Sequence, residues 1–121
     1  MLNCILVGIG GFFGSVCRYL IGLLPIETNG GFPIKTLAIN VIGSFLIGVI
    51  AVLLSKDKGL DPQAALMLRV GLCGGFTTFS TFAIESADLM KNGQMTTAFV
   101  YICLSVILSV AEVFAAQYVV K

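Results

Sequence analysis

The sequence predicts an all-α integral membrane protein with four transmembrane helices, and two observations carry that prediction. Hydrophobic residues make up 58% of the 121 residues, and charged residues only 11%. Soluble domains carry about 25% charged residues, so this chain cannot cover a globule with a polar surface. The apolar residues also fall into four runs, each near the roughly 20 residues that a helix needs to cross a bilayer. We therefore interpret residues 1–121 as a single four-span membrane domain.

The first two spans are expected at residues 2–24 and 34–54. Arg18 is the only charge in the first span. The segment from Pro25 to Pro33 contains an Asn-Gly-Gly sequence, which predicts a turn between the two spans. From residue 37 to residue 54 the second span carries no charge, as expected for a helix inside the bilayer.

The last two spans are expected at residues 63–90 and 95–120. They follow the most polar stretch of the chain, residues 55–62, where Asp61 can cap the third span and Pro62 can take its first helical position. A short turn at residues 91–93 separates the two spans, and Glu112 is the only charge in the fourth.

Charge and residue usage exclude several classes of function. The net charge is +1, whereas neutralising nucleic-acid phosphates needs a strong basic excess, so nucleic acid is excluded as a partner. The chain has no histidine, and an isolated Glu85 or Glu112 does not make a catalytic site. We therefore expect that the protein is not an enzyme. The four cysteines lack CxxC spacing and are expected as small buried thiols.

Polar side chains recur at helical spacing in two of the spans. Because polar groups are costly in lipid, such a stripe faces protein or a water-filled path. The hydroxyls can serve as contacts between helices or solvate an ion, and both interpretations stay open. The stripes are Thr36, Asn40 and Ser44 in the second span, and Thr97, Tyr101, Ser105, Ser109 and Glu112 in the fourth.

Small residues in the first span predict close helix packing. One face carries Gly8, Gly11, Ser15, Arg18 and Gly22, and Gly10 and Gly14 form a second. A guanidinium near the membrane interior needs a partner, a route to the interface or an anion. Arg18 therefore either bonds a structural partner or attracts anions to a vestibule.

The third span is predicted to break near its middle. Gly71, Gly74 and Gly75 precede a run rich in threonine, serine and phenylalanine, and such residues weaken a helix. The freed backbone groups must then be buried in protein or line a cavity, and transporters use them to bind ions such as Na⁺. The alternative is a continuous helix softened by glycine.

Phenylalanines and acidic residues follow the predicted break. Phe76, Phe79 and Phe82 recur at every third position, which is typical of packing. An aromatic ring also has a positive edge, which can favour a dehydrated anion. Glu85 and Asp88 follow within two turns of Phe82.

The loop charges predict almost no preferred orientation in the membrane. Four basic residues are expected on the side of the termini and three on the other. A weak preference can set one orientation. Alternatively, the chain inserts both ways and opposite copies pair as an antiparallel dimer.

Four segments form a recognisable combination over the whole chain. They are residues 10–14 (GGFFG) with Arg18 and Tyr19, residues 36–40 (TLAIN), residues 43–45 (GSF), and residues 71–82 (GLCGGFTTFSTF) with Glu85. This combination resembles the CrcB/Fluc fluoride channel family, and the third-span segment is its most specific part.

The resemblance implies a passive, fluoride-selective channel that exports cytoplasmic fluoride across the bacterial cell membrane and lowers its toxicity. It implies an antiparallel, dual-topology homodimer with two pores, each lined by both subunits. A structural Na⁺, not transported, would be held by the backbone carbonyls of Gly74 and Thr77, and Arg18 would lie at a vestibule. The family's fluoride pathway falls on Asn40, Phe79, Phe82, Thr81, Tyr101, Ser105, Ser109 and Glu85.

Two other functions remain as alternatives at this point. A small proton-coupled multidrug exporter also has four spans and dual topology, but it needs a carboxylate in the first span, where this chain has Arg18. A non-transporting membrane adaptor would use its polar stripes only as contacts between helices.

Overall fold

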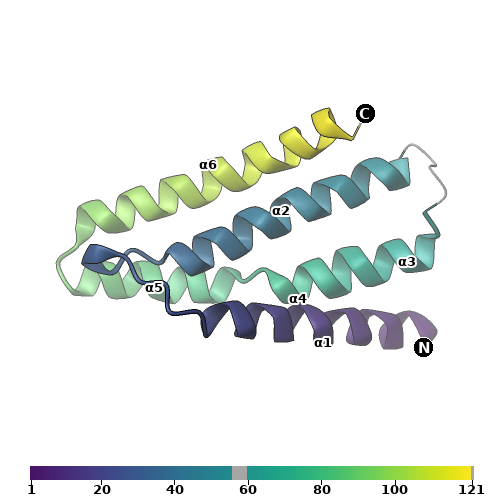
Figure 1. Cartoon of the computed structure of the whole chain (residues 1–121), viewed down its shortest axis with the longest axis horizontal. Coiled ribbons are helices and arrows are strands. Elements are labelled where there is room, and N and C mark those ends of the chain that lie inside the picture. Colours follow the sequence, from purple (N-terminus) through teal and green to yellow (C-terminus); the bar gives the residue numbers. More distant parts are fainter. Residues whose placement is uncertain (56–59, 121) are drawn as a thin grey trace.

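The computed structural model describes residues 1–55 and 60–120, and it is entirely helical in its regular elements (Figure 1). The elements in chain order are α1 (Leu2–Gly22), the 3₁₀ turn η1 (Asn29–Gly31), α2 (Ile34–Ser55), α3 (Pro62–Leu66), the π-helical segment η2 (Met67–Cys73), α4 (Gly74–Phe76), α5 (Phe79–Lys91) and α6 (Met95–Val119).

Four helical stretches are long and apolar enough to cross a membrane: Leu2–Gly22, Ile34–Ser55, Pro62–Lys91 and Met95–Val119. Both termini lie at the end of the molecule where α2 connects to α3, as an even number of crossings requires (Figure 1). The predicted all-α fold with four spans is therefore confirmed. Part of the predicted loop at 55–62 lies outside the described residues. Asp61 occupies the N-cap position of α3, but its side chain makes no capping hydrogen bond.

The third span is broken between α4 and α5, as the sequence predicts. Thr77 has a ψ of 159°, and Thr78 has a φ of −149° and a ψ of 116°, so both residues are extended. Helix resumes at Phe79. The segment η2, immediately before α4, is π-helical, and π-helical turns often occur at functional sites. The alternative of a continuous, softened helix is wrong.

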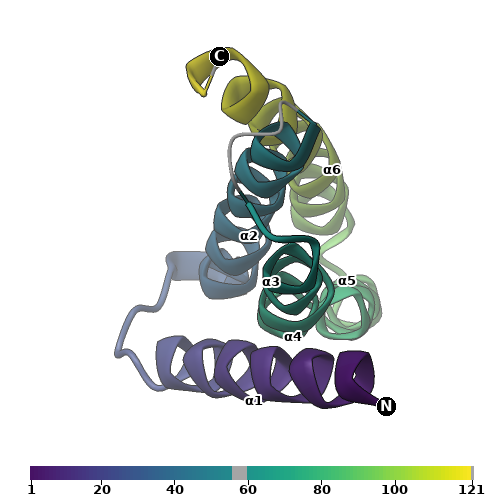
Figure 2. The same cartoon turned by 90° about the vertical axis from the view of Figure 1, so that its right-hand side faces the viewer.

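The break changes the packing partner of the third span. The half before it, η2 and α4, packs mainly against α1, whereas α5 packs against α6. The helix α2 packs along α6 and also contacts both halves of the third span. In the view of Figure 2, α1 lies across one side of the third span, and α2 and α6 extend from the other side.

Close backbone contact joins α1 to the first half of the third span. Gly10 and Gly14 are the buried residues of α1. A Cβ atom at Gly14 would overlap the carbonyl oxygen of Leu72 and lie 2.8 Å from the amide nitrogen of Phe76. The face with Gly10 and Gly14 is thus part of the packing surface, and Gly11 of the other face also lies against Gly75 of α4. A Cβ atom at Gly8, on the other face, would meet no neighbouring atom within 4 Å.

Gly14→Ala is expected to destabilise the protein by about 1–3 kcal/mol, the usual cost of adding a methyl group to a filled contact. The neighbouring backbone of Leu72 cannot move aside as a flexible side chain would. The measurement is thermal unfolding of the detergent-solubilised protein. Gly8→Ala is the matched control, since open space surrounds that position. Equal losses in the two variants would contradict the packing assignment.

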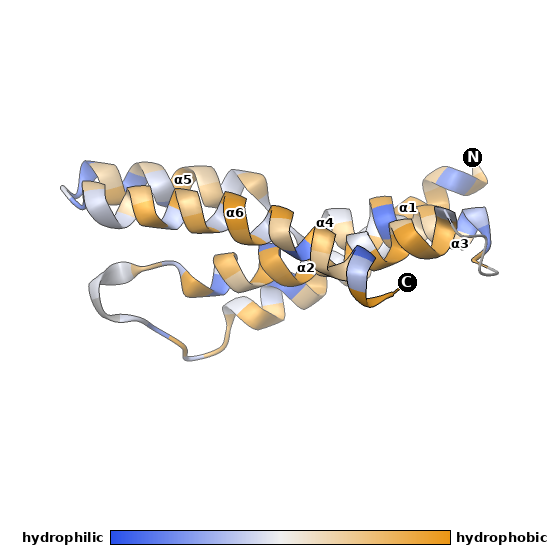
Figure 3. Ribbon diagram, turned by 90° about the horizontal axis from the view of Figure 1, so that it is seen from above, coloured by the Kyte–Doolittle hydropathy of each residue, from blue (hydrophilic) through white to orange (hydrophobic). Residues whose placement is uncertain are grey.

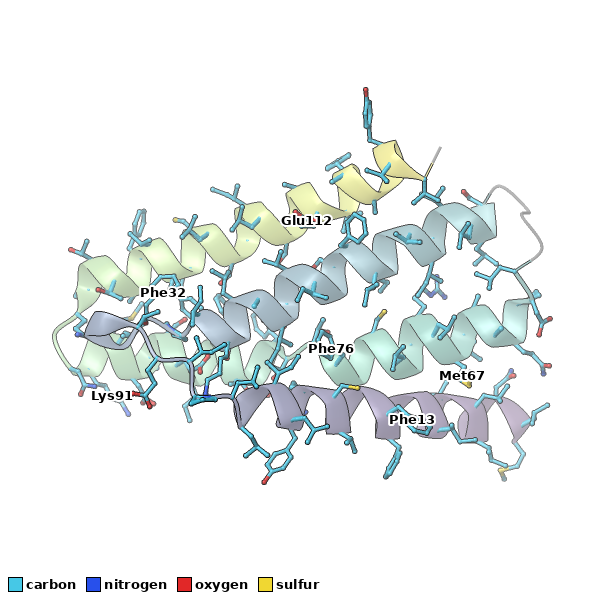
Figure 4. The ribbon with its side chains drawn as sticks, in the orientation of Figure 1. Phe13, Phe32, Met67, Phe76, Lys91 and Glu112 are labelled. Atoms are coloured by element: carbon cyan, nitrogen blue, oxygen red, sulfur yellow. The ribbon has the colours of Figure 1, made fainter. Side chains whose placement is uncertain are left out.

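Large apolar side chains cover the outside of the chain. Phe12 and Phe13 are more than half exposed, and Phe13 points away from the other helices (Figure 4). Hydrophobic residues predominate along α1, α2 and α6 (Figure 3). The expectation of four buried thiols is wrong for α1, where Cys4 and Cys17 are exposed, while Cys73 is buried. Apolar exteriors of this kind suit lipid or a partner subunit.

Candidate functional site

Two grooves lie on either side of the break in the third span. The first, here called the break groove, has a volume of about 370 Å³ and is lined by residues of α2, α4, α5 and α6 together with the break itself. The second, here called the loop groove, has a volume of about 550 Å³ and lies beneath the loop between α1 and α2. Thr78 lines both grooves, so they meet at the break.

The predicted site residues divide between these two grooves. Arg18, Thr81 and Glu85 line the loop groove. Tyr101 lines neither groove, because its side chain is completely buried between α6 and its neighbours. The break groove is lined by Asn40, Phe79, Phe82, Ser105 and Ser109, and by both predicted sodium positions, Gly74 and Thr77.

Asn40 pairs with the extended backbone at the break. The Thr78 amide donates to Asn40 Oδ1 at 2.8 Å, and Asn40 Nδ2 donates to the Thr78 carbonyl at 3.1 Å. The side-chain amide therefore replaces the helical partners that Thr78 loses, which a backbone at membrane depth requires. A neutral amide has two N–H hydrogens, so one of them remains for another acceptor.

The break also frees the carbonyl oxygens of Gly74 and Thr77. In a continuous helix the Gly74 carbonyl would accept from Thr78 N, which here donates to Asn40. The Thr77 carbonyl would accept from Thr81 N, which here donates to Thr78 Oγ1 at 3.2 Å. These two oxygens have therefore lost the donors that a regular helix supplies.

Thr78 also starts the second half of the third span. Its hydroxyl oxygen caps α5 by accepting from Thr81 N, and its hydroxyl donates to Thr81 Oγ1 at 3.0 Å. The capped N-terminus of α5 begins at the break, and the positive end of its dipole favours negative charge there.

Three phenylalanines of the motif have two different environments. Phe76 is buried beside Gly43 of α2 and packs in the interior, as predicted (Figure 4). Phe79 is 79% exposed and Phe82 is half-buried, and both line the break groove. Their ring centroids lie 5.5 Å apart with an interplanar angle of 46°. Phe79 and Phe82 thus reach the break groove, whereas Phe76 does not line it.

Ser105 presents an unpartnered hydroxyl to the break groove. The residue is 7% exposed, and its Oγ is the buried side-chain polar atom without a hydrogen-bond partner among the described residues. Ser109 lines the same groove one turn further along α6. An unpaired buried hydroxyl costs free energy, so a ligand that accepts its hydrogen bond would be stabilised there.

Glu85, which lines the loop groove, accepts hydrogen bonds from two hydroxyl groups. Tyr101 Oη donates to Glu85 Oε1 at 3.0 Å, and Thr36 Oγ1 donates to Glu85 Oε2 at 3.1 Å. The polar stripe of α2 contributes to the lining of both grooves, because Thr36 lines the loop groove and Ser44 lines the break groove.

Arg18 has a structural partner within the loop groove. Its Nε donates to the Gly75 carbonyl at 3.2 Å, which ties α1 to α4 just before the break. Arg18 also lines the loop groove. The two interpretations of Arg18 are therefore compatible, since one nitrogen bonds backbone while the positive charge remains in the groove.

Sequence reasoning missed several contacts of this site. It singled out Asn40 and the glycine-threonine segment separately but not their pairing, which joins residues 38 positions apart. It also missed Phe32, whose ring packs on Tyr101. An aromatic residue after two glycines was the only local signal for Phe32.

The break groove is neutral in its lining. None of the described residues along it is an aspartate, glutamate, lysine or arginine. In the described chain, no three His, Cys, Asp or Glu side chains gather to hold a metal ion. The groove instead offers amide and hydroxyl donors, ring edges and free carbonyl oxygens. Such groups can replace the hydration shell of a small ion without trapping it.

This geometry defines a class: a multi-pass membrane protein whose discontinuous helix presents polar backbone and side chains to a path for a small ion. The family model described as CrcB-like protein, Camphor Resistance (CrcB), matches residues 5–117. The chain belongs to the CrcB family.

Similar proteins carry a common name. A protein of Chlorobaculum tepidum named Fluoride-specific ion channel FluC is 45% identical over 100% of this chain and 96% of its own length. Proteins of the same name from Chlorobium phaeobacteroides and Rhizobium meliloti are 42% and 44% identical over 97% and 95% of this chain, and over 91% and 93% of their own lengths. The family resemblance and the prediction that the chain is not an enzyme are thereby confirmed. With four spans and bacterial relatives, it is a multi-pass protein of the plasma membrane.

Proposed function

We propose that this protein is a passive fluoride channel that lets cytoplasmic fluoride leave the cell. Relatives named as fluoride-specific channels, similar over the full chain, support the substrate. The observation that carries the mechanism is the unpartnered Ser105 hydroxyl beside the Phe79 and Phe82 rings in an uncharged groove.

The proposed pathway supplies donors in place of water. Moving a bare ion into a low dielectric costs on the order of tens of kcal/mol, so a permeating fluoride needs replacement contacts. The free N–H of Asn40, the hydroxyls of Ser105 and Ser109 and the ring edges would provide them. Thr81, Tyr101 and Glu85 would extend the pathway toward the loop groove, with Arg18 attracting anions at its vestibule.

The proposed direction of flow follows from membrane potential. Hydrogen fluoride crosses membranes as a neutral acid and dissociates inside, where the anion is trapped. A negative-inside potential supplies about 2.3 kcal/mol per charge per 100 mV, which is enough to drive an anion outward through a passive path. The channel would thereby lower fluoride toxicity without an energy source of its own.

The deciding experiment is ion efflux from proteoliposomes that contain the purified protein. Vesicles loaded with fluoride or with chloride are compared in parallel, with protein-free vesicles as the blank. We expect rapid fluoride efflux and chloride efflux at the level of the blank. Rapid chloride efflux, or no fluoride efflux, would contradict the proposal. Proton-driven uptake of a lipophilic cation would instead favour the multidrug exporter.

We propose further that the working unit is an antiparallel homodimer with two pores, each lined by both subunits. The exposed Gly74 and the 79% exposed Phe79 support this assembly, because freed backbone and an open groove at membrane depth need protein or water to cover them. Four basic residues are expected on the side of the termini and three on the other side. This small difference supports insertion in both orientations.

Dual topology predicts that terminal tags are accessible from both faces of the membrane. A cysteine-free variant with a single tag at the C-terminus is labelled by an impermeant reagent in intact and in permeabilised cells. We expect about half of the tags to react before permeabilisation, because the charge bias is nearly zero. Labelling restricted to one face would contradict dual topology.

We also propose a structural Na⁺ at the centre of the dimer, held by the Gly74 and Thr77 carbonyls of both subunits. The donor set suits a hard cation, and unwound backbone carbonyls are known ligands for Na⁺. Thr78 N and Thr81 N donate to side chains and not to the Gly74 and Thr77 carbonyls, which supports these two oxygens as ligands. The ion would neutralise the negative ends of the freed carbonyl dipoles.

Removal of Na⁺ is expected to weaken the assembly and slow fluoride efflux. The protein is purified with N-methylglucamine in place of Na⁺, and long incubation allows slow exchange. Because a ligand that binds only the folded state stabilises it, Tm should rise again on adding Na⁺. An unchanged Tm and unchanged efflux after exhaustive removal would contradict the sodium site.

A further inference from the structure

We propose that Phe32, in the loop between α1 and α2, is a positioning residue for the fluoride pathway. Its ring holds Tyr101 so that the tyrosine hydroxyl stays on Glu85, and it separates the buried tyrosine from the loop groove. The inference rests on the proposed channel function and adds a residue that lies outside the four spans.

Phe32 ends a continuous row of aromatic rings that crosses the subunit. The ring centroids of Phe79 and Phe82 lie 5.5 Å apart, those of Phe82 and Tyr101 5.2 Å, and those of Tyr101 and Phe32 5.6 Å. Phe79 lies at the break groove and Phe32 at the loop groove. The row therefore links the two grooves through the interior.

Tyr101 is held between two rings of this row. The Phe32 ring meets it edge-on with an interplanar angle of 81°, and Phe82 lies tilted against it at 51°. Tyr101 is 0% exposed although Phe32 itself lines the loop groove. Removing the Phe32 ring would thus open a gap through which Tyr101 could turn away from Glu85.

The loop around Phe32 is fastened at several points. The Phe32 carbonyl accepts from Thr28 Oγ1 at 2.6 Å and from Ile34 N at 2.8 Å. Gln94, before α6, donates from Nε2 to the Gly30 carbonyl at 3.0 Å, and Gly30 has a φ of 83°, which other residues rarely adopt. A loop fixed in this way places one ring reproducibly, and Figure 4 shows Phe32 between this loop and α6.

The test is fluoride efflux of single and double variants, normalised to folded protein. Phe32→Ala is expected to lower efflux about tenfold, a coupling typical of residues in direct contact. Phe32→Leu keeps most of the side-chain volume and is expected to retain at least about half of the efflux, since volume-conserving swaps are tolerated best. Leu24→Ala is the matched control, because Leu24 lies in the same loop but lines neither groove.

A double-variant cycle separates positioning from general stability. If Phe32 acts through the tyrosine hydroxyl, Phe32→Ala should lower efflux less than about twofold further in a Tyr101→Phe background. Fully additive losses would mean that Phe32 supports only the fold and would overturn the inference.

Two further outcomes complete the test. Should Phe32→Ala not fold, Gln94→Ala releases the loop without removing a ring and is expected to lower efflux about threefold, within the range of coupling between neighbours. If Gln94→Ala shows full efflux and the wild type is active, the inference about Phe32 is overturned, while the proposed channel function stands. Absence of fluoride efflux in the wild type would overturn the proposed function itself.

Discussion

Asn40→Ala is expected to reduce fluoride efflux by about 100-fold or more. The change removes both hydrogen bonds to Thr78, at 2.8 and 3.1 Å, and leaves an amide N–H and a carbonyl without partners at membrane depth. Each unsatisfied buried group costs about 1–3 kcal/mol, so the break would rearrange. The free N–H that Asn40 offers to the anion is lost as well. The measurement is efflux from proteoliposomes, with Tm measured beside it.

Two further variants sharpen this prediction. Asn40→Asp keeps an acceptor for the Thr78 amide but replaces the N–H donor by a carboxylate, so it should also block fluoride. Asn92→Ala removes an asparagine at the turn between α5 and α6, away from both grooves, and should leave efflux unchanged. Efflux of Asn40→Ala within twofold of wild type would show that the pairing with Thr78 is dispensable.

Phe82→Ile is expected to lower fluoride efflux about 10- to 100-fold while leaving the protein folded. Isoleucine fills much of the space but has no ring edge, so the positive periphery offered to a dehydrated anion is lost. Phe82 also packs on Tyr101, with ring centroids 5.2 Å apart, so its loss loosens the row of rings as well. Efflux at matched protein density is the measurement.

The matched control for this prediction is Phe99→Ile. Phe99 lies on α6, is 69% exposed and lines neither groove, so the same substitution there should have no effect on efflux. Equal efflux from the two variants would mean that the Phe82 ring only fills space. Loss of chloride exclusion in Phe82→Ile would instead locate part of the selectivity at this ring.

The local features of the site could be predicted because they depend on short segments. Glycines followed by β-branched residues weaken a helix wherever they occur, and the break indeed follows Phe76. Helical spacing likewise placed Thr36, Asn40 and Ser44 on one face, which the structure turns toward the break and Glu85. The membrane class followed from composition alone.

Other features depended on which helices meet, and periodicity does not reveal that. Both small-residue faces of α1 contribute to its contact with η2 and α4, since Gly10 and Gly14 lie against Leu72 and Gly11 lies against Gly75. Tyr101 belongs to the same predicted stripe as the serines of α6, yet its longer side chain enters the interior and reaches Glu85. Cys4 and Cys17 of α1 are exposed, and the buried residues of this helix are Gly10 and Gly14.

The sequence by itself determined that the chain crosses a membrane four times and that the third crossing is interrupted, because apolar length and helix-weakening residues act within one segment. Only the tertiary structure decided what satisfies the interruption and which side chains surround it. Asn40 and Thr78 meet across 38 residues, and Phe32 reaches Tyr101 from a loop between spans. Such contacts arise from the mutual packing of helices, which one-dimensional spacing does not encode.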